Sequence, residues 1–172
     1  MKALVKSFEY AWQGLIYCLH HERNMRIHLV FTLYMYSFLV FFNFFKISSL
    51  ELSVIFIANA IVFIGELINT AIESTINLIE KKYNKMAKVA KDTAAAAVLV
   101  GAFFAVAIGV ALLWQPEAFG KLFDYYTDNI SMLICLIISL AVSVVYIMIG
   151  PISIWAFLTG KNPQKTNKKT KI

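Results

Sequence analysis

Residues 52–78 read LSVIFIANAIVFIGELINTAIESTINL, and this stretch decides the fold. As a helix it would extend about 40 Å at 1.5 Å per residue, which exceeds the roughly 30 Å hydrocarbon core of a bilayer. No charge interrupts it before Glu66, so we predict a membrane-spanning helix. Glu66, Asn69 and Glu73 then stand at positions i, i+3 and i+7. They form one polar stripe on a single helix face, which Asn77 continues.

Three more apolar segments have the length of a membrane span. They run over Ile27–Phe45, Thr93–Trp114 and Ile130–Leu158. In the last of them Gly150-Pro151 should kink or end the helix, because proline lacks an amide proton and clashes with the preceding turn. With 60% hydrophobic and 15% charged residues, the chain is too apolar for an ordinary soluble domain.

The first 22 residues predict a different kind of helix. At a helical pitch Leu4, Phe8 and Trp12 share one face with Leu15 and Leu19, while polar side chains occupy the opposite face. This pattern is typical of an amphipathic helix lying in the membrane interface. The predicted fold class is therefore all-α: an integral membrane helical bundle with an N-terminal interfacial helix, three core transmembrane helices and a fourth C-terminal hydrophobic helix.

The net charge of +6 is better explained by membrane topology than by a nucleic-acid partner, which we do not expect. Lysine and arginine gather mainly in three clusters, over Lys2–Arg26, Lys81–Lys91 and Lys161–Lys171. Four acidic residues are found in the two complementary loops: Glu51, Glu117, Asp124 and Asp128. By the positive-inside rule, both termini and the loop over residues 80–92 should lie in the cytoplasm.

The depth of the polar stripe indicates a functional site. If the span starts near Leu52, Glu66 lies about 21 Å and Glu73 about 31 Å along the helix. Glu66 would then lie roughly 10 Å below the cytoplasmic boundary, where an ionisable group costs several kcal/mol and marks function by default. One alternative is that both glutamates pair with lysines and hold helices together, but few basic residues share their depth.

The residue types near the stripe suit phosphate chemistry. Lys91-Asp92 directly precedes the third span and faces the inner end of the stripe. Carboxylates from Glu22, Glu66 and Glu73, together with a lysine and amide donors, suit a hard cation such as Mg²⁺ with bound phosphates. Phosphoryl transfer also needs a base for the attacking hydroxyl, and the depth of Glu66 suits a hydroxyl presented by a lipid. The sequence has no GxxxxGKS or GxxxxGKT loop, which excludes a P-loop enzyme.

At these residues the chain closely resembles the bacterial diacylglycerol kinase/undecaprenol kinase family of small integral-membrane lipid kinases. The resemblance covers roughly residues 4–115 and keeps the order and spacing of four stretches. They are Ser7–Gly14, Glu22–His28, Glu66–Glu73 and Ala90–Val98. Asn77 stands where the family usually has aspartate, and Ala95 where some members have serine. Both departures weaken polar contacts beside the site without removing a proposed catalytic group.

The resemblance implies a homotrimer whose sites form between neighbouring subunits, on the cytoplasmic side of the bacterial inner membrane. It implies that Glu66 is the general base for the lipid hydroxyl. Glu22 and Glu73 are implied as ligands of the Mg²⁺ bound to ATP. The other residues implied to bind or neighbour the nucleotide and the reacting groups are Tyr10, Asn69, Lys91 and Asp92.

Within the family, the stretches Glu22–His28 and Glu66–Glu73 resemble the undecaprenol kinases more than the diacylglycerol kinases. His28 stands where members nearer to the diacylglycerol kinases tend to have a second glutamate, so we favour undecaprenol over diacylglycerol as the acceptor. From its position alone, His28 fits either a site residue or a helix-end residue. Residues 1–115 would form the kinase domain, followed by an extra transmembrane segment over 116–160 and a basic disordered tail over 161–172.

Two other functions are compatible with a deep carboxylate. In a small proton-coupled transporter, Glu66 would carry the proton, but Lys91-Asp92 and the other carboxylates would then have no role. A membrane lipid phosphatase would need a histidine nucleophile backed by arginines, and Arg23 and Arg26 are the only arginines in the sequence. Both functions therefore explain fewer residues than a lipid kinase does.

Overall fold

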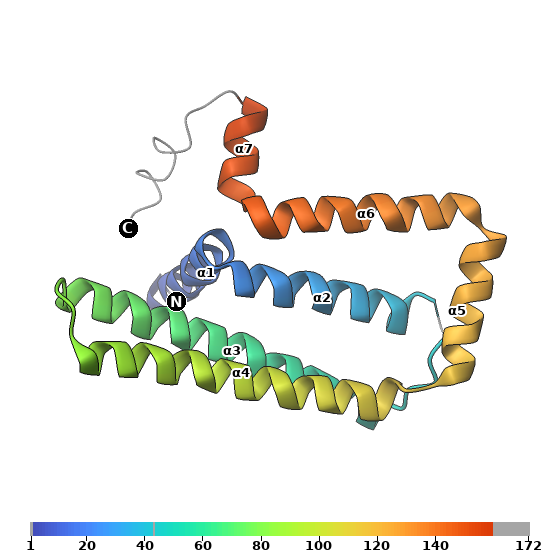
Figure 1. Cartoon of the computed structure of the whole chain (residues 1–172), viewed down its shortest axis with the longest axis horizontal. Helices are drawn as coiled ribbons and strands as arrows, with labels where there is room; N and C mark the ends of the chain where they lie inside the picture. The colour runs from blue at the N-terminus through green and yellow to red at the C-terminus, as the bar shows by residue number, and fades with distance from the viewer. Residues whose placement is uncertain (1, 43, 160–172) are drawn as a thin grey trace. The chain divides into compact units, whose positions relative to one another are not determined.

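The computed structural model describes residues 2–42 and 44–159 (Figure 1). In these ranges the regular structure is helical, without a strand, which confirms the predicted all-α class. The helices are α1 (Lys2–His21), α2 (Arg23–Val40), α3 (Ser49–Ile79), α4 (Lys85–Leu113), α5 (Pro116–Asp128), α6 (Ile130–Ile149) and α7 (Pro151–Thr159). The chain divides into two compact units, residues 28–130 and residues 1–27 with 131–172. The predicted tail over 161–172 lies outside the described residues.

Three of the described helices are long and apolar enough to cross a membrane: α3, α4 and α6. They correspond to three of the four predicted spans. α2 is not among them, because it begins at Arg23 and ends at Val40, short of the predicted Phe45. Its apolar part from Ile27 onward is about 21 Å long at 1.5 Å per residue, less than the roughly 30 Å bilayer core. The predicted first span was therefore too long at its C-terminal end.

α3 and α4 form a closely packed hairpin, the core of the unit of residues 28–130 (Figure 1). Ser48 starts α3 with a capping box, in which its hydroxyl accepts from the Glu51 amide and the Glu51 carboxylate accepts from the Ser48 amide. α4 begins after Asn84, whose side chain accepts from two amides of the first turn. A small residue brings the helices together: a Cβ on Gly65 would stand 3.6 Å from a Val98 methyl group.

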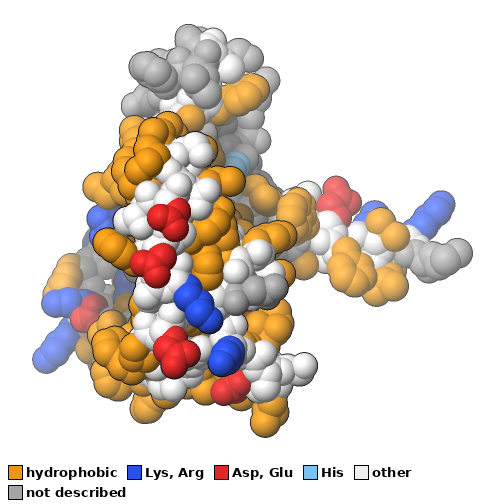
Figure 2. All heavy atoms as spheres, turned by 90° about the vertical axis from the view of Figure 1, so that its right-hand side faces the viewer, with side chains coloured by type: hydrophobic (Ala, Val, Ile, Leu, Met, Phe, Trp, Pro, Cys, Tyr) orange, Lys and Arg blue, Asp and Glu red, His pale blue; other side chains and the backbone are white. Residues whose placement is uncertain are grey.

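α5 is a helix that we did not predict. Pro116 occupies its first turn, where the missing amide proton of proline costs nothing. Aromatic side chains hold α5 to its neighbours: the ring centroids of Tyr125 and Phe42 are 5.5 Å apart, and those of Phe119 and Trp114 are 6.2 Å apart. Figure 2 shows acidic and basic side chains among hydrophobic ones at the α5 end. This mixture, with the aromatic cluster, is typical of a helix at a membrane interface.

The unit of residues 1–27 and 131–172 contains α1, the first turn of α2, α6 and α7. α1 confirms a helix over the predicted amphipathic segment, with Phe8 and Trp12 exposed on its surface. α6 ends at Ile149 and α7 begins at Pro151, with Gly150 between them at φ +78°. This confirms the predicted break. None of the α6 side chains is buried in the described structure, so its apolar surface is available to lipid.

Candidate active site

Glu66 is a buried carboxylate without a hydrogen bond at one of its oxygens. Its side chain is 2% exposed, and its Oε1 lies 3.4 Å from His28 Nε2. That contact has the distance of an ion pair but not the geometry of a hydrogen bond, and Oε1 has no hydrogen-bond partner among the described residues. A buried oxygen without a donor is costly. The site is therefore suited to receive a donor from a ligand, such as a hydroxyl group.

His28 is a site residue rather than a helix-end residue. It lies inside α2, which begins at Arg23, and its side chain reaches Glu66 on α3. The His28 side chain is 25% exposed, whereas that of Glu66 is nearly inaccessible. His28 is therefore a partly exposed side chain in contact with the buried carboxylate.

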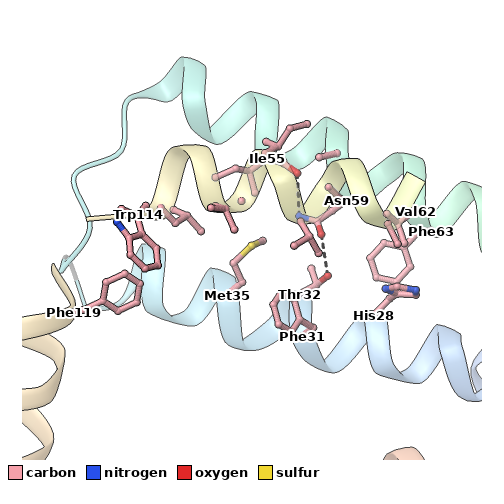
Figure 3. Close-up of a pocket in the computed structure, with 18 residues that line it drawn as sticks. His28, Phe31, Thr32, Met35, Ile55, Asn59, Val62, Phe63, Trp114 and Phe119 are labelled. Carbon is pink, nitrogen blue, oxygen red and sulfur yellow. Dashed lines mark hydrogen bonds between the residues drawn. The ribbon is translucent and has the colours of Figure 1, made fainter. Parts of the chain in front are cut away.

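A cavity of about 350 Å³ begins at His28 and runs between α2, α3 and α4 (Figure 3). Trp114 and Phe119 lie at its other end. The labelled hydrophobic residues along its wall are Phe31, Met35, Ile55, Val62 and Phe63. The volume falls in the range of about 300–1,000 Å³ that is usual for ligand pockets. A wall of this kind, next to a span-length apolar helix, favours a hydrocarbon chain as the occupant.

A polar network interrupts this hydrophobic wall (Figure 3). Thr32 Oγ1 of α2 donates to Asn59 Oδ1 of α3 at 3.3 Å, and Asn59 Nδ2 donates to Tyr36 Oη at 3.0 Å. Asn59 Nδ2 also donates to a backbone carbonyl of its own helix at 3.0 Å. Asn59 lies seven residues before Glu66 and so about 10 Å away along α3. We did not predict this link, although a lone asparagine in an apolar run was a visible signal.

The polar stripe of α3 meets α4 beyond the buried part of the site. Lys91 Nζ of α4 donates to Asn77 Oδ1 of α3 at 2.6 Å. Glu73 precedes Asn77 by one turn on the same face and is exposed, while Asn69 is half-buried between Glu73 and Glu66. The structure thus brings the Lys91 ammonium group to the stripe at Asn77, one helical turn beyond the exposed Glu73.

Three further site residues were predicted: Asp92, Tyr10 and Glu22. Asp92 follows Lys91 on α4 and is exposed. Tyr10 on α1 is 65% exposed, and Glu22 lies at the junction of α1 and α2, in the other compact unit. The meeting of Tyr10 and Glu22 with the residues of α3 and α4 stays a prediction.

The donor set at the stripe fits a nucleotide-bound metal ion. Among the described residues, no three His, Cys, Asp or Glu side chains converge as a metal cage. Mg²⁺ in phosphoryl-transfer sites is usually held by one or two carboxylates, and waters and substrate phosphates complete its octahedron. Exposed Glu73 offers such a ligand, and the neighbouring Lys91 offers a partner for phosphate oxygens.

Comparison with known proteins places the chain in a family. Residues 9–113 match the family model described as prokaryotic diacylglycerol kinase. The chain belongs to this family. Two relatives are each 38% identical to it over 114 residues, a diacylglycerol kinase of Synechocystis sp. and an undecaprenol kinase of Bacillus subtilis. No solved structure matches the chain.

The extent of these matches differs between the two relatives. The aligned part is 66% of this chain and 63% of the Synechocystis protein, so the chain spans less than two thirds of that relative. For the Bacillus protein the shares are 65% of this chain and 88% of the relative. The prokaryotic diacylglycerol kinase match ends at residue 113, where α4 ends. It therefore includes every predicted site residue and leaves α5, α6 and α7 outside.

Proposed function

We propose that the chain is a kinase that transfers the γ-phosphoryl group of ATP to the hydroxyl of a membrane lipid, with undecaprenol as its preferred acceptor. The observation that carries the proposal is the buried, unpartnered Glu66 oxygen beside His28, at one end of a hydrophobic cavity. A lipid alcohol satisfies both features, because its hydroxyl donates to the carboxylate while its chain occupies the cavity. Membership of the prokaryotic diacylglycerol kinase family supports the kinase chemistry.

In this proposal Glu66 is the general base. It accepts the hydroxyl proton while the lipid oxygen forms a bond to the γ-phosphorus, and the bond to the bridging β-phosphate oxygen breaks to release ADP. His28 orients the carboxylate, and Lys91 neutralises phosphate charge. Glu22 and Glu73 hold the Mg²⁺ of Mg-ATP. When bound, that ion offsets the negative charge of the phosphates and orients them.

The remaining predicted contacts complete the nucleotide site. Asn69 holds the reacting groups between Glu66 and Glu73, and Asp92 and Tyr10 contact the nucleotide. In the proposed homotrimer, neighbouring subunits share each site, so residues of α1 and residues of the α3–α4 hairpin come from different subunits.

The cavity wall supports a prenol more than a diacylglycerol. Beyond its hydroxyl, undecaprenol is pure hydrocarbon, whereas the ester groups of a diacylglycerol need hydrogen-bond donors. The amide group of Asn59 already donates to Tyr36 and to its own helix backbone. The Thr32 hydroxyl donates to Asn59. The donors of Asn59 and Thr32 are thus already engaged, and this part of the wall favours a chain without polar groups.

Lipid phosphorylation tests the proposal directly. Purified chain receives undecaprenol, diacylglycerol or ceramide with radiolabelled Mg-ATP in the same detergent, and kcat/KM is measured for each lipid. We expect the highest kcat/KM for undecaprenol. A clearly higher value for diacylglycerol would reverse the substrate assignment and keep the kinase, whereas labelling of none of the lipids would contradict the proposed function.

The proposal requires the α3–α4 loop to face the cytoplasm, where ATP is available. Tyr83, 82% exposed in this loop, is a better labelling position than Asn84, which caps α4. In a chain whose own cysteines, Cys18 and Cys135, are replaced by serine, we expect Tyr83→Cys to react with an impermeant maleimide only after lysis. Phe123→Cys on α5 is the control and should react in intact spheroplasts. Labelling of Tyr83→Cys from outside would invert the orientation.

A further inference from the structure

Arg26 is a buried guanidinium that joins the ends of two helices. Its side chain belongs to the first turn of α2, and the residue is 6% exposed. Nη1 donates to the backbone carbonyls of Leu19 at 3.2 Å and His20 at 3.1 Å, in the last turn of α1. Nε donates to the carbonyl of Ile147 at 3.1 Å, in the last turn of α6. One side chain therefore holds the C-terminal ends of α1 and α6.

These contacts give hydrogen-bond partners both to the buried guanidinium and to the carbonyl groups at the helix ends. The last carbonyls of a helix have no intrahelical donor and carry partial negative charge, so a cation is favourable there. Arginine supplies five donors in a rigid planar fork and can bridge two helix ends as lysine cannot. The positive charge of Arg26 also affects the neighbouring His20. The pKa of His20 is lowered mainly by burial, next by the charge of His21, and least by the charge of Arg26.

Gly150 completes the arrangement from the C-terminal side. Its φ of +78° is a conformation that favours glycine. A Cβ at this position would stand 3.4 Å from both Cζ and Nη1 of Arg26. A Cβ would thus only touch the guanidinium, but any side chain at this φ strains the backbone, so a substitution at Gly150 would disturb the break that packs against Arg26.

Arg26 and the three carbonyl groups that it binds, which we call the Arg26 clamp, lie next to the junction that carries Glu22. Glu22 is the single residue between α1 and α2, and its amide donates to the Cys18 carbonyl at 2.8 Å. The carbonyls held by Arg26 belong to Leu19 and His20, in the turn just before it. The Arg26 side chain therefore holds the backbone of the turn that leads directly into Glu22.

We propose that Arg26 is a positioning residue that uses the end of α6, a helix outside the family match, to hold Glu22 in place for Mg-ATP. The inference rests on the proposed function, because it takes Glu22 to be a ligand of the nucleotide-bound ion. It gives a role to the C-terminal segment: the end of α6 and Gly150 hold the junction that carries Glu22 in the same chain. The affinity for Mg-ATP should then depend on a glycine far outside the matched residues 9–113.

The test compares two glycine substitutions in the full-length chain. Gly150→Ala disturbs the clamp, whereas Gly120→Ala in α5 is the control, because a Cβ there would meet nothing within 4 Å. We expect Gly150→Ala to raise KM for Mg-ATP by about 3- to 10-fold, with kcat and KM for the lipid nearly unchanged. Gly120→Ala should leave all three constants unchanged. A Gly150→Ala chain that keeps the KM for Mg-ATP of the unmodified chain would overturn the proposal.

Arg26→Lys is a second variant that tests the same interaction, and it keeps the proposal testable if Gly150→Ala does not fold. Lysine keeps the positive charge but lacks the planar set of guanidinium donors, so we expect the same selective rise in KM for Mg-ATP. In the double variant, Gly150→Ala should add little to Arg26→Lys, because both remove one interaction. Additive effects of the two substitutions would overturn the coupling. Failure of the unmodified chain to phosphorylate any lipid would instead overturn the proposed function, and with it the role of Glu22.

Discussion

Replacing Glu66 with glutamine should lower kcat by about 10²-fold or more, the range expected for a positioned general base, while Mg-ATP binding survives. Glutamine keeps the size of the side chain and can still accept a hydrogen bond, but it cannot take the hydroxyl proton. Glu66 is buried on α3. Lys91 contacts the polar stripe at Asn77, which lies about three turns beyond Glu66 along the same helix. The substitution therefore acts on the acceptor end of the site and not on the nucleotide end.

The experiment measures kcat and both KM values for Glu66→Gln and for a matched control, together with equilibrium binding of a non-hydrolysable ATP analogue. Glu117→Gln on α5 makes the same chemical change outside the family match and should leave kcat unaltered. Near-normal turnover in Glu66→Gln would end the assignment of the general base. His28, 3.4 Å from Glu66 Oε1, would then be the next candidate for that role.

The position of Glu66 along its helix was predictable because it depends on one helix only. A carboxylate in the second half of a span-length apolar run has a fixed depth, whatever the helix packs against. The structure confirms that Glu66 is buried and that Lys91 reaches the stripe. The break at Gly150-Pro151 was predictable for the same reason, since the effect of proline on a helix is local.

Apart from Lys91 at the stripe, the features that depend on two helices meeting were not predicted. The cavity is lined by residues from α2, α3 and α4 together with Phe119 of α5. Its hydrophobic lining residues look like core residues in the sequence. The hydrogen bonds of Asn59 with Thr32 and Tyr36 require the register between α2 and α3, which periodicity within either helix does not contain.

Arg26 shows a second reason why sequence patterns miss contacts. In the sequence it belongs to the basic N-terminal cluster, and the positive-inside rule explains it as a topological anchor. Its partners are backbone carbonyls of Leu19, His20 and Ile147. Backbone groups are present at every position and leave no mark in the sequence, so only the folded chain reveals this use of the guanidinium.

Replacing Glu73 with glutamine should weaken Mg-ATP binding by about 10- to 100-fold, the loss expected when one charged contact worth roughly 1.5–3 kcal/mol disappears. Glu73 lies seven residues beyond Glu66 and so about 10 Å closer to the Lys91 end of the stripe. Its exposure makes it accessible to a nucleotide arriving from solution. Since glutamine still offers one neutral oxygen to the cation, raised Mg²⁺ should restore part of the binding.

The measurement is KM for ATP at several Mg²⁺ concentrations, with equilibrium binding of the same ATP analogue and Glu117→Gln as the control for a lost surface charge. In Glu73→Gln, kcat at saturating Mg-ATP should fall much less than in Glu66→Gln, because the base is intact. If the analogue no longer binds to Glu66→Gln but still binds to Glu73→Gln, the two roles are reversed. Unchanged KM for ATP in Glu73→Gln at every Mg²⁺ concentration would remove Glu73 from the nucleotide site and leave Lys91 and Asp92 as its proposed contacts on α4.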